Sequence, residues 1–524
     1  MANRESENKF FSKVSLNMVT NIIRVIAMAL VGFLMVPYYI DQFGQATYAL
    51  LPLATSITTY VLIASESLAD SFARFLILTI QGKDTENIDR TFSSSVIGML
   101  RLILILLPIV FLISILSPFI FSTGDAGQFD VQMMFFLVLV SALLVSFTTC
   151  LNSVYMAYNQ LYVMYIFRTV HCVLQVALVL LFFFIEGPSL IFLGISYLIA
   201  AILLIIALVI GIKKIDPALK VHRKAHDKAL VKEMSGLGLW AMMTRLGNIL
   251  FIQTSQIVVN ICLGSSIQTE FSIAANIVSM ITTVCSAITA VGVPLAYKHY
   301  HNEDSEKMRT TLDIFTRFTG LIMVFPLAFI CVFAPQLLTA WLGSTYNVIT
   351  LMFILVPACV SRCALEVLCD IPILYARAKD LAVYTLITGA LNVILALTFI
   401  EFTDLGVIGV CIAWDVSVLI LNFVFIPPFI SRLMGISRFN FYKPLIVNYI
   451  AFGALIGLGW ILIQFWTMPY RWLAIIITML IGFLIYFAII LNIGLKKSEK
   501  NMVATFVPEK IQNILFKIAP SFRQ

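Results

Sequence analysis

The chain contains few charged residues for its length. Asp, Glu, Lys and Arg together make up 12% of its 524 residues, whereas hydrophobic residues make up 61%. Because soluble domains are about 25% charged, this composition excludes an ordinary soluble globular protein. Uncharged runs of about 18 or more residues recur along the chain, and each is long enough to cross a hydrocarbon layer roughly 30 Å thick. The composition therefore predicts a protein that crosses a membrane many times.

Cysteine is absent from the loops between these runs. All nine cysteines, from Cys150 to Cys411, fall inside apolar segments, and we therefore expect no disulfide. Cys359 and Cys363 share a helix face, but they lack the further Cys or His partners that a metal site needs. A packing role is favoured for both, and the sequence indicates neither a metal nor another cofactor.

The apolar segments number about fourteen. Long apolar segments separated by short polar loops are typical of an all-α polytopic membrane protein, and we predict about 14 transmembrane helices. Their approximate bounds are 16–40, 46–80, 92–117, 131–157, 161–185, 188–212, 236–262, 267–298, 311–334, 348–376, 380–402, 406–431, 443–466 and 470–495.

Lysine and arginine are nearly absent from the loops on one side of these helices. The loops DQFGQAT, SPFIFSTGDAGQFD, EGPS, GSSIQTE and EFTDLG contain neither, and Arg471 is the exception. The other side carries Lys83, Arg90, the run KKIDPALKVHRKAHDKALVKEM, Lys298 to Arg309, Arg377, Lys379, Arg432 to Lys443 and the tail after Lys496. Since cytoplasmic loops carry the excess of Lys and Arg, we predict a multi-pass protein of the cytoplasmic (inner) membrane with both termini in the cytoplasm. The net charge of +7 then reflects topology and contact with anionic membrane lipids, not nucleic-acid binding.

The two halves of the chain resemble each other at an offset of about 220 residues. The offset pairs Gly44 with Gly264, Ala54 with Ala274, Asp84 with Asp304, Thr85 with Ser305 and Glu86 with Glu306. An even number of crossings per half indicates a parallel repeat of two pseudo-symmetric lobes, and rocking of two lobes around one cleft is the geometry of alternating access. The predicted parts are a six-helix lobe (1–212), a basic cytoplasmic linker (213–235), a second six-helix lobe (236–431), two additional transmembrane helices (432–495) and a cytoplasmic tail (496–524).

Polar residues form a stripe on each of the two leading helices. Asn17, Asn21 and Arg24 share a face of the first, and Arg245 and Asn248 share a face of the seventh. Two interpretations stay open for the arginines. In one, they converge on a shared cavity, where their forked donors suit phosphate oxygens. In the other, each extends to the cytoplasmic interface.

The fifth helix carries a similar stripe of Arg168, His171 and Gln175. Its position leaves the same two interpretations open, because an ionisable side chain at membrane depth usually faces a cavity or reaches the interface. We treat Arg168 as a further candidate for phosphate binding, and His171 and Gln175 as candidate polar cavity residues.

Ionisable residues also follow one another on the tenth helix. Arg362, Glu366 and Asp370 are spaced by four residues, which predicts an ion ladder along one face. Such a ladder either braces the helix or binds a coupling cation or proton. Weaker candidates for ion coupling are Glu66, Asp70 and Asp415.

The stretch LNVILALTFIEFTDLGVIGVCIAWDVSVLI resembles a pattern of polysaccharide transporters and oligosaccharide (O-antigen-type) flippases. These belong to the multidrug/oligosaccharidyl-lipid/polysaccharide (MOP) exporter superfamily. The pattern consists of Asn392, then apolar residues, then Gly406 and Gly409 opening the next helix, with Ala413 a turn later. The early stretch VPYYIDQFGQATYALLPLA also resembles that family, although Ala49 stands where glycine is common.

The resemblance implies a fold of two MATE-like six-helix lobes around a central cavity, with two extra C-terminal helices. It further implies a flippase that moves a polyprenyl-diphosphate-linked oligosaccharide, such as a lipopolysaccharide O-antigen precursor, by ion- or potential-coupled alternating access. A polymerase and glycosyltransferases are then the expected protein partners. Consistent with transport that hydrolyses no ATP, the sequence contains no G-x-x-x-x-G-K-[ST] loop. The related lipid II flippases carry cavity arginines on their first and seventh helices, and Arg24 and Arg245 match those helix positions.

Two other functions compete with this reading. A cation-coupled multidrug antiporter of the same superfamily is expected to present acids in its cavity. A membrane-embedded glycosyltransferase or polymerase normally needs a sizeable extramembrane loop with clustered acids or histidines, whereas the longest loop here is about twenty residues. We therefore expect a transporter and not an enzyme.

Overall fold

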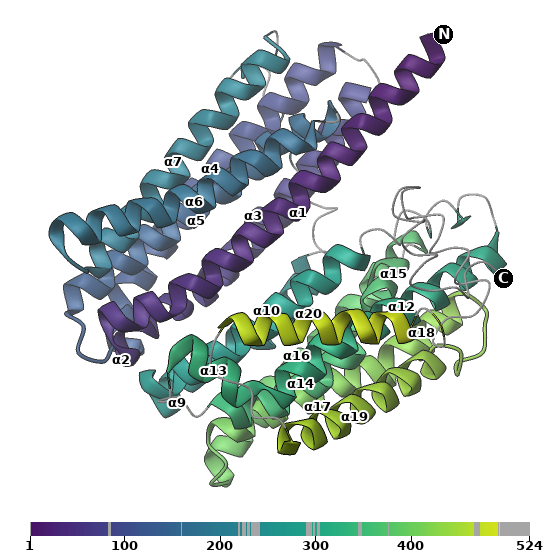
Figure 1. Ribbon diagram of the computed structural model, residues 1–524. Helices are drawn as coiled ribbons and strands as arrows, with labels where there is room; N and C mark the ends of the chain where they lie inside the picture. Colours follow the sequence, from purple (N-terminus) through teal and green to yellow (C-terminus); the bar gives the residue numbers. More distant parts are fainter. Residues whose placement is uncertain are drawn as a thin grey trace. The chain divides into compact units, whose positions relative to one another are not determined.

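The computed structural model describes residues 2–81, 85–158, 160–217, 242–289, 304–343, 348–375, 377–465 and 472–490, together with residues 219, 221, 222, 227, 231, 296, 299, 300 and 492. All regular secondary structure within this part of the chain is helical (Figure 1). The helices group into two compact units. Unit 1 consists of Met1–Ser272 and Thr385–Ile400, and unit 2 of Ile273–Tyr384 and Glu401–Gln524.

Unit 1 is built from long helices that cover most of its residues. They are α1 (Ala2–Phe43), α2 (Gln45–Tyr48), α3 (Leu50–Gln81), α4 (Thr85–Ile120), α5 (Gln128–Ala157), α6 (Leu161–Glu186), α7 (Leu190–Ile215), the segment Met242–Ile249, α9 (Ile252–Leu263), the start of α10 (Ser265–Thr289) and most of α16 (Ala378–Phe402). Helix α5 packs against α3, α4 and α7 and is largely buried. The serines of α5 lie in this apolar interior because their hydroxyls donate to carbonyls of the preceding turn, as Ser141 does to Val138.

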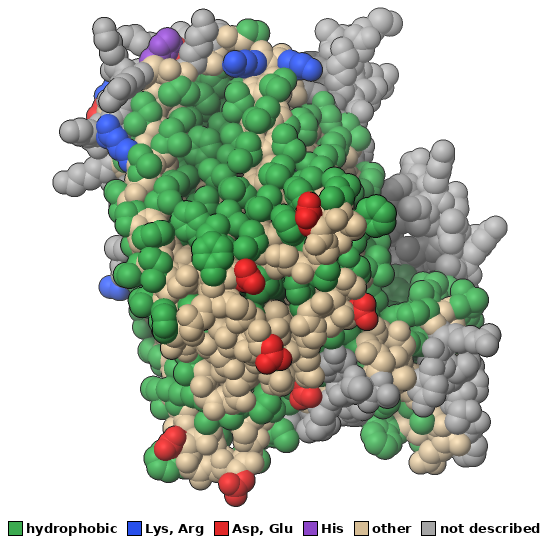
Figure 2. Space-filling model, turned by 90° about the vertical axis from the view of Figure 1, so that its left-hand side faces the viewer, with side chains coloured by type: hydrophobic (Ala, Val, Ile, Leu, Met, Phe, Trp, Pro, Cys, Tyr) green, Lys and Arg blue, Asp and Glu red, His purple; other side chains and the backbone are tan. Residues whose placement is uncertain are grey.

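The outer helices of unit 1 expose large apolar side chains. Leu104 on α4, Phe184 on α6 and Leu203 on α7 are examples. On the face in Figure 2, hydrophobic side chains form a broad surface, with Lys and Arg mostly at its upper end and Asp and Glu lower. Such a surface suits hydrocarbon and not water, and it marks a membrane protein.

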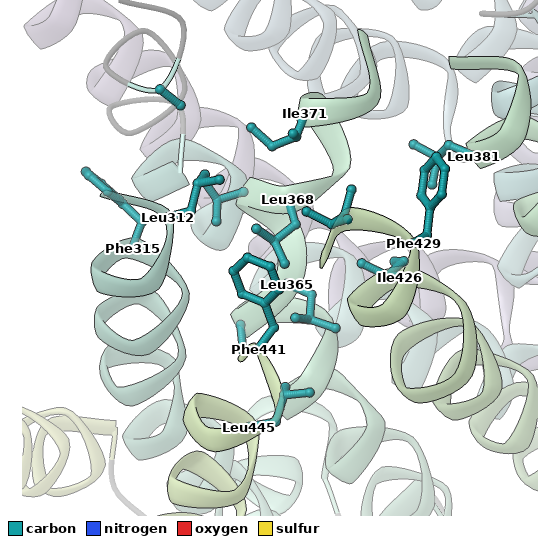
Figure 3. Close-up of a cluster of buried hydrophobic side chains, with 14 of the residues drawn as sticks. Leu312, Phe315, Leu365, Leu368, Ile371, Leu381, Ile426, Phe429, Phe441 and Leu445 are labelled. Carbon is teal, nitrogen blue, oxygen red and sulfur yellow. The ribbon is translucent and has the colours of Figure 1, made fainter. Parts of the chain in front are cut away.

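Unit 2 contains the second set of helices. They are the rest of α10, α12 (Ser305–Val332), α13 (Ala334–Leu342), α14 (Val348–Leu365), the 3₁₀ turn η2 (Glu366–Asp370), α15 (Ile371–Leu374), α17 (Val407–Leu419), the π-helical turn η3 (Ile420–Phe425), α18 (Ile426–Leu433), α19 (Tyr442–Phe465) and α20 (Trp472–Ile489). Its core gathers side chains from several of these elements, including Leu312, Leu368, Phe429 and Phe441 (Figure 3).

The predicted all-α polytopic class is confirmed. Twelve helices of the described residues are long and apolar enough to span a membrane, and a thirteenth is obtained when Met242–Ile249 and Ile252–Leu263 are joined across a bend of 41°. The predicted number of about fourteen is therefore close. The predicted span 348–376 is not among these helices; in that stretch α14 ends at Leu365 and is followed by η2 and α15.

The predicted domain boundaries stay a prediction. Much of the linker 213–235 and all of the tail 496–524 lie outside the described residues. In the described part of the linker, Arg90 of α4 forms an ion pair with Asp227.

Candidate functional site

Arg24 of α1 is held in a defined orientation by two neighbours. Its Nε and Nη2 atoms donate hydrogen bonds of 3.1 and 2.9 Å to Oδ1 of Asn21, one turn earlier. Its guanidinium also lies 5.5 Å from the ring centroid of Tyr165 on α6, within the range of a cation–π interaction. The predicted polar face of the first helix thus continues onto α6.

Asn17, the third member of that stripe, has a different partner. Its Oδ1 accepts a hydrogen bond of 2.7 Å from the backbone N–H of Tyr162 in the first turn of α6. Because the first N–H groups of a helix have no partner within the helix, this contact caps α6 and ties it to α1. Asn17 therefore positions α6, the helix that carries Tyr165 and Arg168.

Arg168 lies one turn beyond Tyr165 and interacts electrostatically with both Arg24 and Glu66. Its Nε atom is buried and has no hydrogen-bond partner among the described residues. His171, a further turn along, is half-buried and close enough to Arg168 to interact with its charge. Gln175 instead hydrogen-bonds to Tyr197 of α7. The three residues of the stripe on α6 therefore differ in role: Arg168 and His171 lie near charged groups, whereas Gln175 contacts α7.

Arg245 forms an ion pair with Glu66 of α3, in which Nη1 donates to Oε2. Both side chains are about two-fifths exposed. Asn248, one turn after Arg245, is also exposed. The side chain of Asp70, on α3 beyond Glu66, lies outside the described residues.

Three arginines and one carboxylate are thus connected within unit 1. Glu66 pairs with Arg245, Arg168 interacts with Glu66 and Arg24, and Tyr165 stacks on Arg24. We call Arg24, Arg168, Arg245 and Glu66 the arginine cluster. With one carboxylate against three guanidiniums, the cluster has an excess of two positive charges and suits an anion with several oxygens.

Several polar contacts of α3, α6 and α9 were not predicted from the sequence. Tyr165 could have been found from its spacing of three residues before Arg168. Further along α3, Tyr60 hydrogen-bonds to Thr254, and Ser56 donates 3.0 Å to Oε1 of Gln256. These pairs join α3 to α9 across about 200 residues of sequence, a separation over which no local pattern predicts a contact.

The predicted ion ladder has a different geometry in unit 2. Arg362 lies in the last turn of α14, whereas Glu366 and Asp370 belong to the 3₁₀ turn η2, in which residues four apart no longer share a face. Glu366 accepts a hydrogen bond of 2.8 Å from Ser286 of α10. Within the described residues, no ion pair joins it to Arg362. A continuous ladder is therefore wrong for these residues, and their role in ion coupling stays a prediction.

Asp415 of α17 lies beside other polar groups of unit 2. It is half-buried, and its Oδ1 has no hydrogen-bond partner among the described residues. The π-helical turn that follows places Asn422 so that its Nδ2 donates 3.0 Å to Ser361 of α14. Tyr449 of α19 donates 3.1 Å to the carbonyl of Pro357. π-helical turns such as η3 are frequent at functional sites.

An apolar groove of about 300 Å³ lies between α12, α19 and α20. Phe329, Leu458 and Ile485 line it, and Thr478 is one of its few polar side chains. The hydroxyl of Tyr486 is turned away to donate 3.0 Å to the carbonyl of Leu321. The groove therefore suits a hydrocarbon chain. In the described part of the chain, no three His, Cys, Asp or Glu side chains form a metal-ligand set.

Comparisons of the sequence with known proteins found a family and a similar membrane protein. Residues 53–351 match a family described as "Polysaccharide biosynthesis protein". The uncharacterized membrane protein EpsK of Bacillus subtilis (strain 168) is 23% identical over 436 residues, which cover 83% of this chain and 86% of that protein.

Solved structures of similar fold include multidrug transporters. An inward-facing MATE family transporter of the MOP superfamily has a TM-score of 0.63 at 14% identity, over 84% of this chain and 98% of that chain. The Vibrio cholerae MATE transporter VcmN in its bent form has a TM-score of 0.57 at 12% identity, over 86% and 100%. At these identities the likeness concerns the fold.

Proposed function

Because the chain belongs to the family of polysaccharide biosynthesis proteins, as a polysaccharide transporter of the MOP superfamily, we propose that it flips a polyprenyl-diphosphate-linked oligosaccharide across the cytoplasmic membrane. The proposed direction is from the cytoplasmic to the outer leaflet, with both termini in the cytoplasm. Glycosyltransferases would supply the substrate and a polymerase would consume the flipped product.

The arginine cluster is the observation that carries this proposal. A diphosphate diester carries two negative charges, which equal the excess positive charge of the cluster. Planar guanidiniums bind phosphate oxygens through two parallel N–H bonds, whereas an ammonium acts as a point charge. The buried Nε of Arg168 supplies a donor that has no partner among the described residues. We assign the diphosphate to Arg24, Arg168 and Arg245.

The sugar would occupy polar surroundings near the diphosphate, where Asn21, Asn248 and His171 supply hydrogen-bonding groups.

A drug antiporter remains the second candidate because of the likeness to multidrug transporters. A cavity for cationic drugs is favoured by excess carboxylate, whereas the arginine cluster has excess guanidinium, so the anionic substrate is preferred. For coupling, we propose that the acids of unit 2, Asp415 and Glu366 in the first place, bind the cation or proton.

The proposal is tested with the double variant Arg24→Ala/Arg245→Ala in proteoliposomes that contain a fluorescent polyprenyl-diphosphate disaccharide. We expect flipping, measured as access of an added glycosidase to the substrate, to fall at least ten-fold. Arg101→Ala, which changes an exposed arginine of α4, is the matched control and should flip normally. The double variant Arg24→Lys/Arg245→Lys should keep part of the activity, because lysine retains the positive charge but lacks the two parallel N–H donors of a guanidinium. Normal flipping by the double alanine variant would refute the diphosphate assignment.

A further inference from the structure

The membrane span that carries Arg245 is broken at Leu250 and Phe251. The segments Met242–Ile249 and Ile252–Leu263 meet there at 41°. Phe251 has φ −78° and ψ −87°, which departs from α-helical geometry. Neither residue at the break is proline or glycine, so the local sequence does not force the bend. Sharp kinks have few other causes, and one of them is a side chain inserted into the backbone hydrogen-bond ladder.

Asn392 of α16 is that side chain. It is fully buried, and its Nδ2 donates to the carbonyls of Leu250 and Phe251 at 2.9 and 3.1 Å and to Oγ of Ser255 at 3.1 Å. Ser255 in turn donates 2.6 Å to the Phe251 carbonyl. The amide therefore contacts both carbonyls at the break, of which that of Phe251 also accepts a helical bond of 3.4 Å from the N–H of Ser255.

Two further hydrogen bonds join groups at the break. The N–H of Phe251 donates 3.3 Å to the carbonyl of Asn248, a short turn in place of the bond to Gly247. Thr254 donates 3.2 Å from its hydroxyl to the Ile249 carbonyl. Since an unpaired backbone group at membrane depth costs several kcal/mol, a bend is stable there only when side chains fill in for the lost bonds.

Two glycines let Asn392 reach the break. A Cβ on Gly389, one turn before Asn392, would lie 2.6 Å from the carbonyl oxygen of Gly247. A Cβ on Gly247 would in turn lie 2.8 Å from the backbone of Thr385. The two helices are therefore in backbone contact, and the short side chain of Asn392 spans the remaining distance.

The bend determines where Arg245 lies. Arg245 is about 7 Å along the helix axis from Leu250, so straightening by 41° would displace its backbone by about 5 Å. A hydrogen-bonded ion pair tolerates a shift of well under 1 Å. We propose that Asn392 is a positioning residue: it latches the seventh span in its bent form and thereby places Arg245 beside Glu66. The consequence for transport rests on the proposed function, whereas the latch itself does not.

The latch is tested by distance measurement without substrate. Spin labels are placed at Met242 and Leu104 in a cysteine-free background, and the distance between them is measured by pulsed electron resonance. A second pair at Ile261 and Leu104 reports the far side of the break; Leu104 and Ile261 are both exposed. Asn392→Leu keeps the size of the side chain but removes the donor. Met242 is about 12 Å along the helix axis from Leu250, so we expect the first distance to shift by up to about 8 Å and the second to stay unchanged.

Two further variants separate the latch from general packing. Ile252→Pro adds proline at the first residue of α9, where it costs no hydrogen bond and restores a bend; combined with Asn392→Leu it should return the first distance to its original value. Asn260→Leu removes another buried amide of the same span, bound to Ser122, and should shift neither distance.

The outcomes decide the proposal. An unchanged Met242–Leu104 distance in Asn392→Leu, or a shift of both distances, would overturn the latch. In the flipping assay, Asn392→Leu should lose activity and the Ile252→Pro combination should recover it. If the unmodified protein fails to flip the substrate, the proposed function is wrong. The distance measurements need no substrate, so they still test whether Asn392 holds the bend.

Discussion

At the scale of single residues, one contact of the arginine cluster follows from sequence spacing, whereas others arise only in the tertiary structure. The turn between Asn21 and Arg24 predicts their shared face, and the two side chains are in fact hydrogen-bonded. The partners of Arg245 and Asn17 come from distant helices, so nothing near them in the sequence indicates Glu66 or Tyr162. Glu66 was considered for ion coupling, but in the structure it is the counter-ion of Arg245.

The pairing of Glu66 leads to a prediction about affinity. Glu66→Gln keeps the size of the side chain and removes the charge that competes with an anion for Arg245. We expect the affinity for geranylgeranyl diphosphate, measured by calorimetry, to rise about five-fold, since an ion pair this exposed contributes about 1 kcal/mol at most. Glu186→Gln, an exposed carboxylate at the end of α6, is the control and should change nothing. Weaker binding by Glu66→Gln would contradict the idea that Glu66 competes with the anion for Arg245.

At the scale of helices, small residues decide how closely neighbours approach. Asn448 of α19 is fully buried over Gly320 of α12, and a Cβ on Gly320 would lie 1.9 Å from its Nδ2 and 3.1 Å from Cβ of Ala364. A Cβ on Gly320 would therefore have to displace the buried amide of Asn448. Close packing of this kind holds membrane helices together where lipid supplies no hydrophobic drive.

Gly320→Ala is therefore expected to destabilise unit 2 by about 1–3 kcal/mol, as overpacking does elsewhere. The measurement is thermal unfolding of the purified protein in detergent. Gly457→Ala on α19 is the matched control, because a Cβ there meets nothing within 4 Å. Its melting temperature should stay the same or rise slightly, since alanine favours a helix. Equal melting temperatures for both variants would disprove the packing argument.

The helix boundaries show where sequence patterns fail. A continuous apolar run predicted one helix over 348–376, yet α14 ends at Leu365. Pro372 lies at the start of α15, and its ring cannot accommodate a regular helical carbonyl at Leu368, which belongs to η2. The proline was visible in the sequence, but many transmembrane prolines only bend a helix. Which of them breaks one depends on the packing around it.

At the scale of the whole molecule, the sequence predicts the family and the orientation in the membrane. The resemblance indicated by Asn392, Gly406 and Gly409 is confirmed by the family match. Asn392 is also the residue that contacts the break in the span of Arg245. The predicted orientation in the membrane rests on Lys and Arg in the loops of one side.

That orientation predicts the location of reporter fusions. A fusion at Gly124, in the loop between α4 and α5 without Lys or Arg, should be active with alkaline phosphatase and dark with green fluorescent protein. Fusions at Asp216, after α7, and after Gln524 should give the opposite result. Alkaline phosphatase activity at Asp216 would reverse the assigned topology.

The sequence by itself determined the membrane class, the approximate position of most helical spans and the family, because long apolar runs and loop charge are local properties of the chain. Only the tertiary structure decided that Glu66 pairs with Arg245, that Asn392 occupies the break near it, and that Asp415 has a buried oxygen without a partner among the described residues. The reason is physical. A polar group at membrane depth must be satisfied by whatever lies beside it, and the partner here comes from a helix more than a hundred residues away.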